Sequence, residues 1–386
     1  MRLTRLPPDH GATPGHVRFA GLVSEAGNAD GAIWVDVPEA LAADVTDRLD
    51  TWLLWILPHA FATGQDLVID GAVDAELLRN ADALMEIWSR WRPDRRPIRV
   101  VAEPVDPTAL GARAAPERTV LFFTCGVDSF FSLYHHDHQD ASAGERGSLG
   151  WRPVDDLVYV HGFDIPLEHV AAFEAKRTTL ARVAADTGKT VVLLATNLRE
   201  TGVRQPWGPV MHGPALGGVG VLLGDRWRTV LLSSWCCHDH DGPWGSTGIT
   251  DPLLSTSLTR TRPYGEGHDR FEKLEYLVRF PLVLDTLHVC WEERSEGNCG
   301  RCEKCLRTLI ALDILGVRDR ATTFPPGAVD LDRLPAVWKD TPQLTRVYAY
   351  LRDHAARAGR ADIVAVIDSC RRAGTSGGPP SVPAPS

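Results

Sequence analysis

The sequence predicts an α/β protein whose main sheet is parallel and flanked by helices, with a small α/β unit before it and a helical extension after it. Four short apolar runs carry this prediction, because their starts lie about 33 to 39 residues apart, the length of a strand, a helix and two loops. The runs are Thr119–Phe123, Leu157–Val160, Thr190–Ala195 and Thr229–Ser233. A helical pattern over Leu167–Thr187, stopped by Gly188, joins the second run to the third, as in a βαβ unit.

Residues 1–103 are predicted to form a separate N-terminal α/β unit. Alternation of apolar and polar residues indicates strands at His16–Ser24, Gly31–Val37 and Ile98–Ala102, and Ala75–Trp91 has the apolar spacing of a helix. The stretch 104–117 is rich in Pro and Ala and is typical of a linker. The sequence gives this unit no evident role.

The main domain is predicted to span 118–318, and helices are expected at Arg270–Val278 and Leu306–Leu315. Residues 319–373 are predicted to form a helical extension. The last stretch, 374–386, reads GTSGGPPSVPAPS and has the composition of a disordered tail.

Composition excludes several classes of protein. Of the 386 residues, 44% are hydrophobic and 24% charged, the balance of a soluble globular chain. A net charge of -9 counts against bare nucleic acid as the main partner, since phosphate binding needs a basic surface. The N-terminus has Pro and Gly where a signal peptide needs an apolar core, and no apolar run reaches membrane-spanning length. We therefore expect a cytoplasmic protein with no membrane partner.

A short loop between the first apolar run and a following apolar helix is the strongest functional signal. It consists of Thr124, Cys125, Gly126, Val127, Asp128 and Ser129. A tight turn from a buried strand into a helix presents free backbone N–H groups and the positive end of the helix dipole, which suits pyrophosphate. The loop is not a Walker loop, because GxxxxGK is missing. The alternative is an ordinary strand-to-helix turn in which Asp128 or Ser129 caps the helix.

This loop resembles that of the PP-loop family, the N-type ATP pyrophosphatases, which carry SGGxDS between the first strand and the first helix. Gly126, Asp128 and Ser129 match that pattern. Thr124 keeps the hydroxyl of the first serine, whereas Cys125 replaces the first glycine, and a positive φ there would cost about 1 kcal/mol or more. The resemblance implies that all six loop residues bind ATP. Asp128, which would hold Mg²⁺, and Ser129 are the expected catalytic residues.

Four cysteines within sixteen residues indicate a metal site. They are Cys290, Cys299, Cys302 and Cys305, spaced C-x8-C-x2-C-x2-C. Pairs separated by two residues form the knuckle turns of zinc–thiolate sites, and Gly300 permits a tight turn. Four sulfurs leave no open coordination position, so Zn²⁺ is expected in a structural role. An iron–sulfur cluster or unliganded thiols are the alternatives.

The order of the two motifs is similar to that in the 7-cyano-7-deazaguanine synthase branch of the PP-loop family, which carries a four-cysteine zinc site of this spacing. The matching region covers roughly 118–315, about half of the chain. The resemblance implies that a substrate carboxylate attacks the α-phosphate of ATP, pyrophosphate leaves, and ammonia attacks the acyl adenylate. In that branch a second activation converts the resulting amide to a nitrile. The N-terminal unit and the C-terminal extension depart from that compact enzyme and leave the substrate open.

Polar residues also follow two other predicted strands. The loop Trp235–Asp241 (WCCHDHD) is predicted to contact substrate rather than to bind a second metal, since adjacent cysteines cannot easily share one ion. His161, Asp164 and Glu168 follow the second strand, and belong either to a substrate pocket or to a solvated loop.

A charged helix near the cysteines carries two basic residues on one face. Arg270 and Lys273 are predicted to lie on the solvated side of this helix, as such charge runs usually do. The alternative is that they reach toward bound phosphates.

Three hypotheses for function remain. The favoured one is an ATP-dependent ligase that adenylates a carboxylate or amide oxygen of a small molecule and uses ammonia or another nitrogen donor. In the second, the acceptor is a tRNA base or a protein, because other PP-loop enzymes modify tRNA and some relatives of the deazaguanine branch act on macromolecules in bacterial defence. The acidic net charge counts against tRNA. The third is a non-enzymatic binding module with a decayed loop, which retention of Asp128 and Ser129 disfavours. A homo-oligomer stays open.

Overall fold

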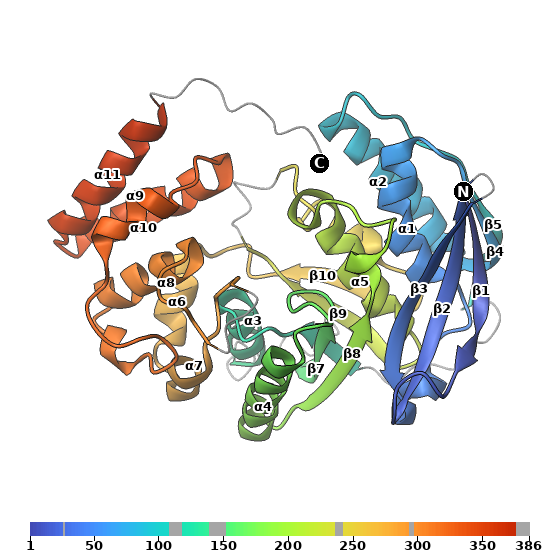
Figure 1. The fold of residues 1–386 in the computed structure, drawn as a ribbon, viewed down its shortest axis with the longest axis horizontal. Coiled ribbons are helices and arrows are strands. Elements are labelled where there is room, and N and C mark those ends of the chain that lie inside the picture. The colour runs from blue at the N-terminus through green and yellow to red at the C-terminus, as the bar shows by residue number, and fades with distance from the viewer. Residues whose placement is uncertain (26–27, 108–117, 139–151, 236–241, 293–296, 376–386) are drawn as a thin grey trace. The chain divides into compact units, whose positions relative to one another are not determined.

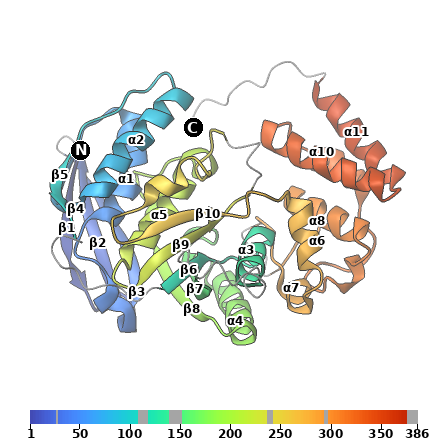
Figure 2. The same ribbon diagram turned by 180° about the vertical axis from the view of Figure 1, so that it is seen from behind.

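The computed structural model describes residues 1–25, 28–107, 118–138, 152–235, 242–292 and 297–375. These residues form one ten-stranded sheet with the strand order β10-β9-β6-β7-β8-β3-β2-β1-β4-β5 (Figures 1 and 2). The strands are β1 (Arg2–Asp9), β2 (His16–Glu25), β3 (Asn28–Pro38), β4 (Leu67–Asp74), β5 (Val100–Val105), β6 (Arg118–Phe122), β7 (Val154–His161), β8 (Thr190–Thr196), β9 (Trp227–Ser233) and β10 (Arg260–Tyr264). The sheet is mostly parallel and flanked by helices, which confirms the α/β part of the predicted fold class.

The four predicted apolar strands are present as β6, β7, β8 and β9. Strand β6 pairs in parallel with both β7 and β9, and β7 pairs in parallel with β8. The predicted helix between β7 and β8 is α4 (Val170–Thr187), which ends at Gly188 in the left-handed conformation. A fifth parallel strand, β10, adds to β9 at residues that the sequence places in a loop-rich region.

The N-terminal strands continue the same sheet, because β3 pairs antiparallel with β8 through Val35↔Thr196 and Asp36↔Ala195. This differs from the predicted separate unit at 1–103. Helix packing also joins the N-terminal residues to the main domain. Helix α1 (Asp50–Thr63) is apolar on nearly every side and packs against α5 (His212–Leu222) (Figures 1 and 2). A Cβ on Gly218 of α5 would come within 2.3 Å of the Trp55 indole nitrogen, so glycine there permits the close approach.

Different helices pack against the two faces of the parallel strands. Val120 and Phe122 of β6 and Val158 of β7 belong to the core that contains α1 and α5. Because side chains alternate along a strand, the intervening residues face the other way. On that side Tyr159 stacks on Phe173 of α4, with ring centroids 6.2 Å apart. The sheet is thus covered by helices on both faces, and α2 (Ala75–Trp91) begins at the residue predicted for it.

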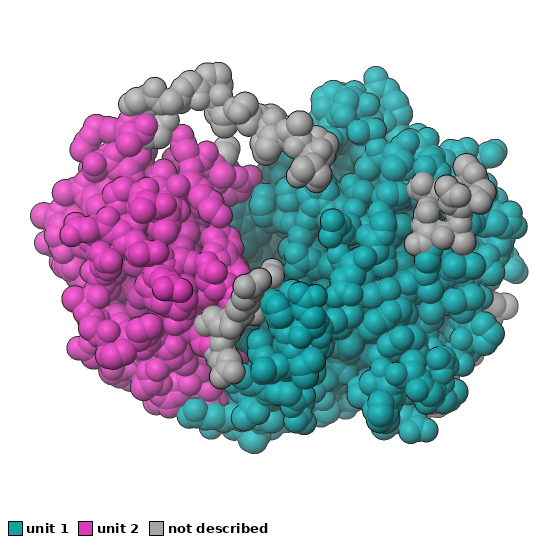
Figure 3. Space-filling view, viewed as in Figure 1, with its two compact units in different colours: residues 1–124, 132–267 teal, residues 125–131, 268–386 magenta. Residues whose placement is uncertain are grey.

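The chain divides into two compact units, coloured separately in Figure 3. Unit 1 comprises Met1–Thr124 and Ser132–Gly267 and contains the whole sheet; unit 2 comprises Cys125–Phe131 and His268–Ser386. The helices of unit 2 after Gly267 are α6 (Arg270–Leu277), α7 (Pro281–Thr286), α8 (Glu303–Ile314), α9 (Leu334–Val337), α10 (Pro342–Arg357) and α11 (Ala361–Thr375). Helix α3 (Val127–His138) begins in unit 2 and ends in unit 1. Over the described ranges, no helix has both the length and the apolar character needed to cross a bilayer.

Candidate functional site

The predicted phosphate loop leaves the carboxyl end of β6. In the sheet order, β7 and β8 follow on one side of β6, while β9 and β10 lie on the other. The strand order therefore reverses at β6, and ligands of open α/β sheets bind at such a switch point beyond the carboxyl ends of the strands. The segment Thr124–Ser129 starts there and runs directly into α3.

Cys125 has the backbone conformation of a glycine. Its φ is 62°, and among the described residues it is the one non-glycine residue with a positive φ. A non-glycine residue in this region costs about 1 kcal/mol or more and persists only where its surroundings hold it. The position that the PP-loop pattern gives to glycine therefore takes a glycine-type backbone in this chain. The Cys125 side chain lies in the core, with 0% exposure.

This geometry predicts the outcome of Cys125→Gly. Glycine adopts the left-handed backbone without strain, so ATP-dependent pyrophosphate release should be retained or improved. The free energy of unfolding should change by about 1 kcal/mol or less, because relief of strain offsets the lost burial of the thiol. Steady-state kinetics and thermal unfolding would measure both. Loss of turnover with ATP affinity intact would instead assign Cys125 a chemical role, as nucleophile or redox switch.

Gly126 and Ser129 close the start of α3. The Gly126 N–H donates to Ser129 Oγ at 3.1 Å, and the Ser129 hydroxyl donates to the Gly126 carbonyl oxygen at the same distance. The Phe130 N–H donates to that carbonyl at 3.0 Å, which makes Gly126 the cap of the helix. The N–H groups of Val127 and Asp128 lie in the first helical turn, where no acceptor exists within the helix. The loop thus combines a left-handed residue with a helix N-terminus.

Asp128 is held by two basic residues of α6. Its carboxylate accepts from Arg270 Nη1 at 2.5 Å and from Lys273 Nζ at 3.4 Å. Burial acts to raise the pKa of Asp128, but the charges of Arg270 and then Lys273 outweigh it and hold the pKa below its usual range. The prediction that Arg270 and Lys273 lie on a solvated face is wrong, since the Lys273 side chain is only 1% exposed. Both turn inward because the loop supplies a buried carboxylate for them.

Lys176 is a candidate residue that the sequence reading missed. It lies on α4, is buried, and donates from Nζ to the carbonyl oxygen of Thr124 at 2.9 Å. A signal was available, because Lys176 shares the apolar stripe of α4 with Leu180, Val183 and Ala184. A lysine on the buried face of a helix requires a partner, and here that partner is the first residue of the loop.

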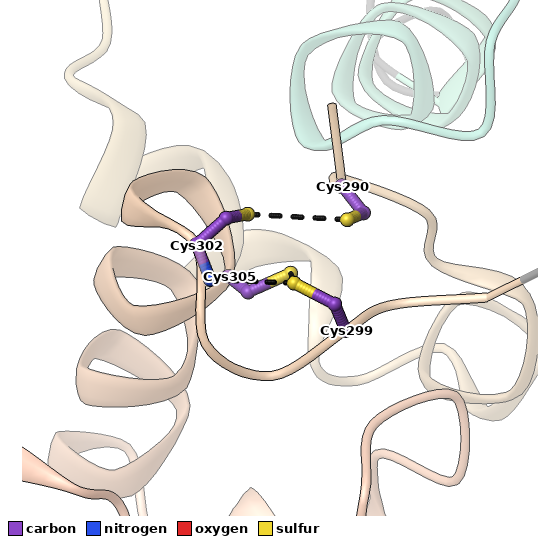
Figure 4. A group of neighbouring side chains, drawn as sticks. All are labelled: Cys290, Cys299, Cys302 and Cys305. Atoms are coloured by element: carbon purple, nitrogen blue, oxygen red, sulfur yellow. Dashed lines mark hydrogen bonds between the residues drawn. The ribbon is translucent and has the colours of Figure 1, made fainter. Parts of the chain in front are cut away.

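The four predicted cysteines meet at one point in unit 2 (Figure 4). Their sulfur atoms all lie within 4.8 Å of one another; Cys290 Sγ is 3.9 Å from Cys302 Sγ, and Cys299 Sγ is 3.9 Å from Cys305 Sγ. Zn–S bonds of about 2.3 Å in a tetrahedron place sulfurs about 3.8 Å apart, so this spacing fits one zinc ion. The group could therefore hold a metal such as zinc.

Local backbone geometry brings the four cysteines together. Gly300 has a φ of 70°, which turns the chain between the second and third cysteines, and the Cys302 N–H donates to Cys299 Sγ at 3.3 Å. Cys302 then caps α8, and Cys305 lies in its first turn. Hydrogen bonds within the group, first to Cys302 and then to Cys305, lower the pKa of Cys290 to about 3, whereas the bond with Cys290 raises the pKa of Cys305. A bound cation would replace these shared protons.

Among the residues that the structure describes, the remaining predicted residues do not gather into a second site. His161 is buried, stacks on Phe173 at 4.1 Å and contacts the Pro166 carbonyl oxygen through Nε2, and burial lowers its pKa. Asp164 and Glu168 are exposed, as the solvated-loop alternative predicts. Of the predicted substrate loop Trp235–Asp241, residues 236–241 lie outside the described residues.

Comparison with known proteins gave no match. No family model matches the chain, and no curated protein or solved structure is significantly similar to it. The geometry of the loop and of the four-cysteine group is therefore the basis for a functional proposal.

Proposed function

We propose that this protein is an ATP-dependent, ligase-type enzyme of the PP-loop pyrophosphatase kind, in which Thr124–Ser129 binds the phosphates of ATP. The observation that carries the proposal is the left-handed backbone of Cys125 directly before the first turn of α3. A left-handed residue next to a helix N-terminus turns successive N–H groups toward one side, and concave arrangements of this kind bind anions. This favours a phosphate cradle over a plain turn.

Basic side chains at the loop favour the same ligand. Arg270 and Lys273 share the single carboxylate of Asp128, so this group carries a net positive charge. Within unit 1, Lys176 donates to the carbonyl oxygen of Thr124, the residue that precedes this group in the chain. On nucleotide binding, we expect Mg²⁺ to take the Asp128 carboxylate while the phosphates take Arg270 and Lys273. Asp128 would thus pair with Arg270 and Lys273 in the ligand-free protein and hold Mg²⁺ in the complex.

The proposed reaction follows from phosphate binding at this loop. A carboxylate or amide oxygen of the substrate attacks the α-phosphorus of ATP, the bond from that phosphorus to the bridging oxygen breaks, and pyrophosphate leaves. Ammonia or another nitrogen donor then attacks the activated carbon, and AMP departs with the oxygen. The loop orients the phosphates and stabilises the charge that develops on pyrophosphate. Asp128, through Mg²⁺, and the Ser129 hydroxyl are the proposed catalytic groups.

The four-cysteine group is proposed to bind Zn²⁺ in a structural role. Four thiolates complete the coordination sphere and leave no position for substrate or water. The metal would hold the turn at Gly300 and the start of α8 together, and it would take no part in bond making.

The proposal is tested by measuring pyrophosphate release from ATP and Mg²⁺ with ammonia present, against a panel of carboxylic acids, amides, tRNA and proteins. We expect release that depends on one class of acceptor and yields AMP. The wild-type protein should also bind ATP with Mg²⁺ in calorimetry even without acceptor. Absence of ATP binding would contradict the proposal, and release with a macromolecule alone would move the acceptor from small molecule to tRNA or protein.

A further inference from the structure

A hydrogen bond connects the phosphate loop to the segment that carries the first cysteine of the metal group. The carbonyl oxygen of Cys125 accepts from the backbone N–H of His288 at 2.8 Å. Cys125 is the residue with the left-handed backbone, and His288 lies two positions before Cys290. Since a left-handed cysteine needs its surroundings to hold it, this contact is one of the groups that keep the loop in its conformation.

Asn298 fixes the segment around His288. Its Oδ1 accepts from the Val289 N–H at 2.8 Å and from the Cys290 N–H at 3.2 Å, and its Nδ2 donates to the Leu287 carbonyl at 2.8 Å. The Asn298 side chain therefore bonds to backbone groups on both sides of His288. It is 5% exposed, and it immediately precedes Cys299, the second cysteine.

We propose that Asn298 is a positioning residue that links the metal centre to the phosphate loop. With a metal bound, Cys290 and Cys299 are tied together, and Asn298 carries that constraint to the His288 N–H. That N–H donates to the Cys125 carbonyl oxygen and so fixes the orientation of this peptide unit. The orientation of the peptide unit in turn sets the direction of the N–H groups that follow in the loop. The consequence for phosphate binding rests on the proposed function; the mechanical link between Asn298 and Cys125 does not.

The link is tested by the reactivity of the Cys125 thiol, which is fully buried when the loop is held. Metal-loaded Asn298→Ala should be alkylated at Cys125 about tenfold faster than the wild type. Without the Asn298 hydrogen bonds, the segment around His288 and the loop should open locally more often and expose the thiol. Peptide mass spectrometry resolves Cys125 from the other thiols, and metal content is measured on the same sample. Alkylation of Cys125 at the wild-type rate would overturn the proposal.

Thr323→Val is the matched control, because Thr323 Oγ1 accepts from Asn298 Nδ2 at 3.0 Å and Thr323 is not among the residues that bond to Asn298 around His288. It removes one hydrogen bond of Asn298 and leaves the three backbone contacts around His288. Wild-type alkylation of Cys125 is expected. Labelling as fast as in Asn298→Ala would mean general loosening of unit 2 and would contradict a specific link.

A double-mutant cycle covers the effect on ligand binding. Asn298→Ala should weaken binding of ATP with Mg²⁺ about tenfold in the wild-type background, and by less in Cys125→Gly, because glycine needs no external hold on its φ. Equal losses in both backgrounds would overturn the link.

Should the wild type bind no ATP, the proposed function fails while the alkylation rates still decide the link. Should Asn298→Ala not fold, hydrogen exchange of the wild type decides instead: slow exchange at the His288 amide supports the link, and exchange as fast as in exposed loops refutes it.

Discussion

Asp128→Asn is expected to lower the kcat/KM of ATP-dependent pyrophosphate release by about a hundredfold or more. Asparagine keeps the size of the side chain but not its charge, so it holds neither Mg²⁺ in the complex nor Arg270 and Lys273 in the ligand-free protein. Initial rates of pyrophosphate release over a range of ATP concentrations, at saturating Mg²⁺, measure the effect. Wild-type turnover in this variant would reduce the loop to a helix cap and remove the main support for an enzyme.

The same change should also destabilise the protein. From the sequence alone, Asp128→Asn is expected to change folding little, because asparagine can still cap a helix. The structure leads us to expect a larger loss, because Asp128 pairs with the buried Lys273, and removing one partner of a buried ion pair costs about 3 kcal/mol. Thermal or urea unfolding of the variant tests this loss of stability.

Glu303→Gln separates the two effects of Asp128→Asn. Glu303 is a buried carboxylate of unit 2 that pairs with Arg307 at 3.1 Å and accepts from the Tyr348 hydroxyl at 3.1 Å, and it has no contact with the loop in the described structure. Its amide variant should lose a comparable amount of stability, because Arg307 is left buried and unpaired. Because Arg307 also interacts electrostatically with Asp128 and Arg270, turnover of the folded protein should fall, but far less than in Asp128→Asn. A hundredfold loss in Glu303→Gln as well would mean that destabilisation alone explains both variants.

Cys302→Ser should abolish metal binding and destabilise the protein by more than about 4 kcal/mol, because a structural metal contributes directly to the free energy of folding. Cys302 occupies the N-cap position of α8 without a side-chain cap, and it supplies one of four sulfurs within 4.8 Å of one another, so its loss opens the coordination sphere. Metal analysis of the wild type should find one zinc ion per chain and no visible chromophore. A brown, iron-containing protein, or a Cys302→Ser variant that keeps one zinc, would contradict the assignment.

Cys370→Ser is the control for the loss of a buried thiol. Cys370 lies on α11 in the same unit, is 3% exposed and is outside the metal group. Its replacement should cost about 1 to 2 kcal/mol through lost apolar burial and should leave the zinc content unchanged. Circular dichroism during thermal unfolding, with metal analysis of each sample, distinguishes the two cysteines.

Features that depend only on residues close together in the sequence were predictable. The C-x2-C-x2-C spacing brings three ligands together through one turn and the first turn of a helix, so the metal group could be identified without the fold. The helix Ala75–Trp91 was found because its apolar residues recur at helical spacing, and the structure adds that the Asp74 side chain caps it. The parallel strands of the main domain were likewise visible as buried apolar runs.

Features that depend on residues far apart in the chain were decided by the tertiary structure. Nothing local indicates that β3 pairs with β8, since any strand edge offers the same backbone groups and packing of α1 on α5 selects the partner. The burial of Lys273 depends on a carboxylate 145 residues away, and the left-handed backbone of Cys125 on an amide of His288. The sequence by itself thus determined the four apolar strands of the main domain, the helix Ala75–Trp91 and the four-cysteine group, which local propensity and spacing encode. Tertiary contacts decided which strands join, which charges are buried and how the loop is held, because those choices are made by packing between distant residues.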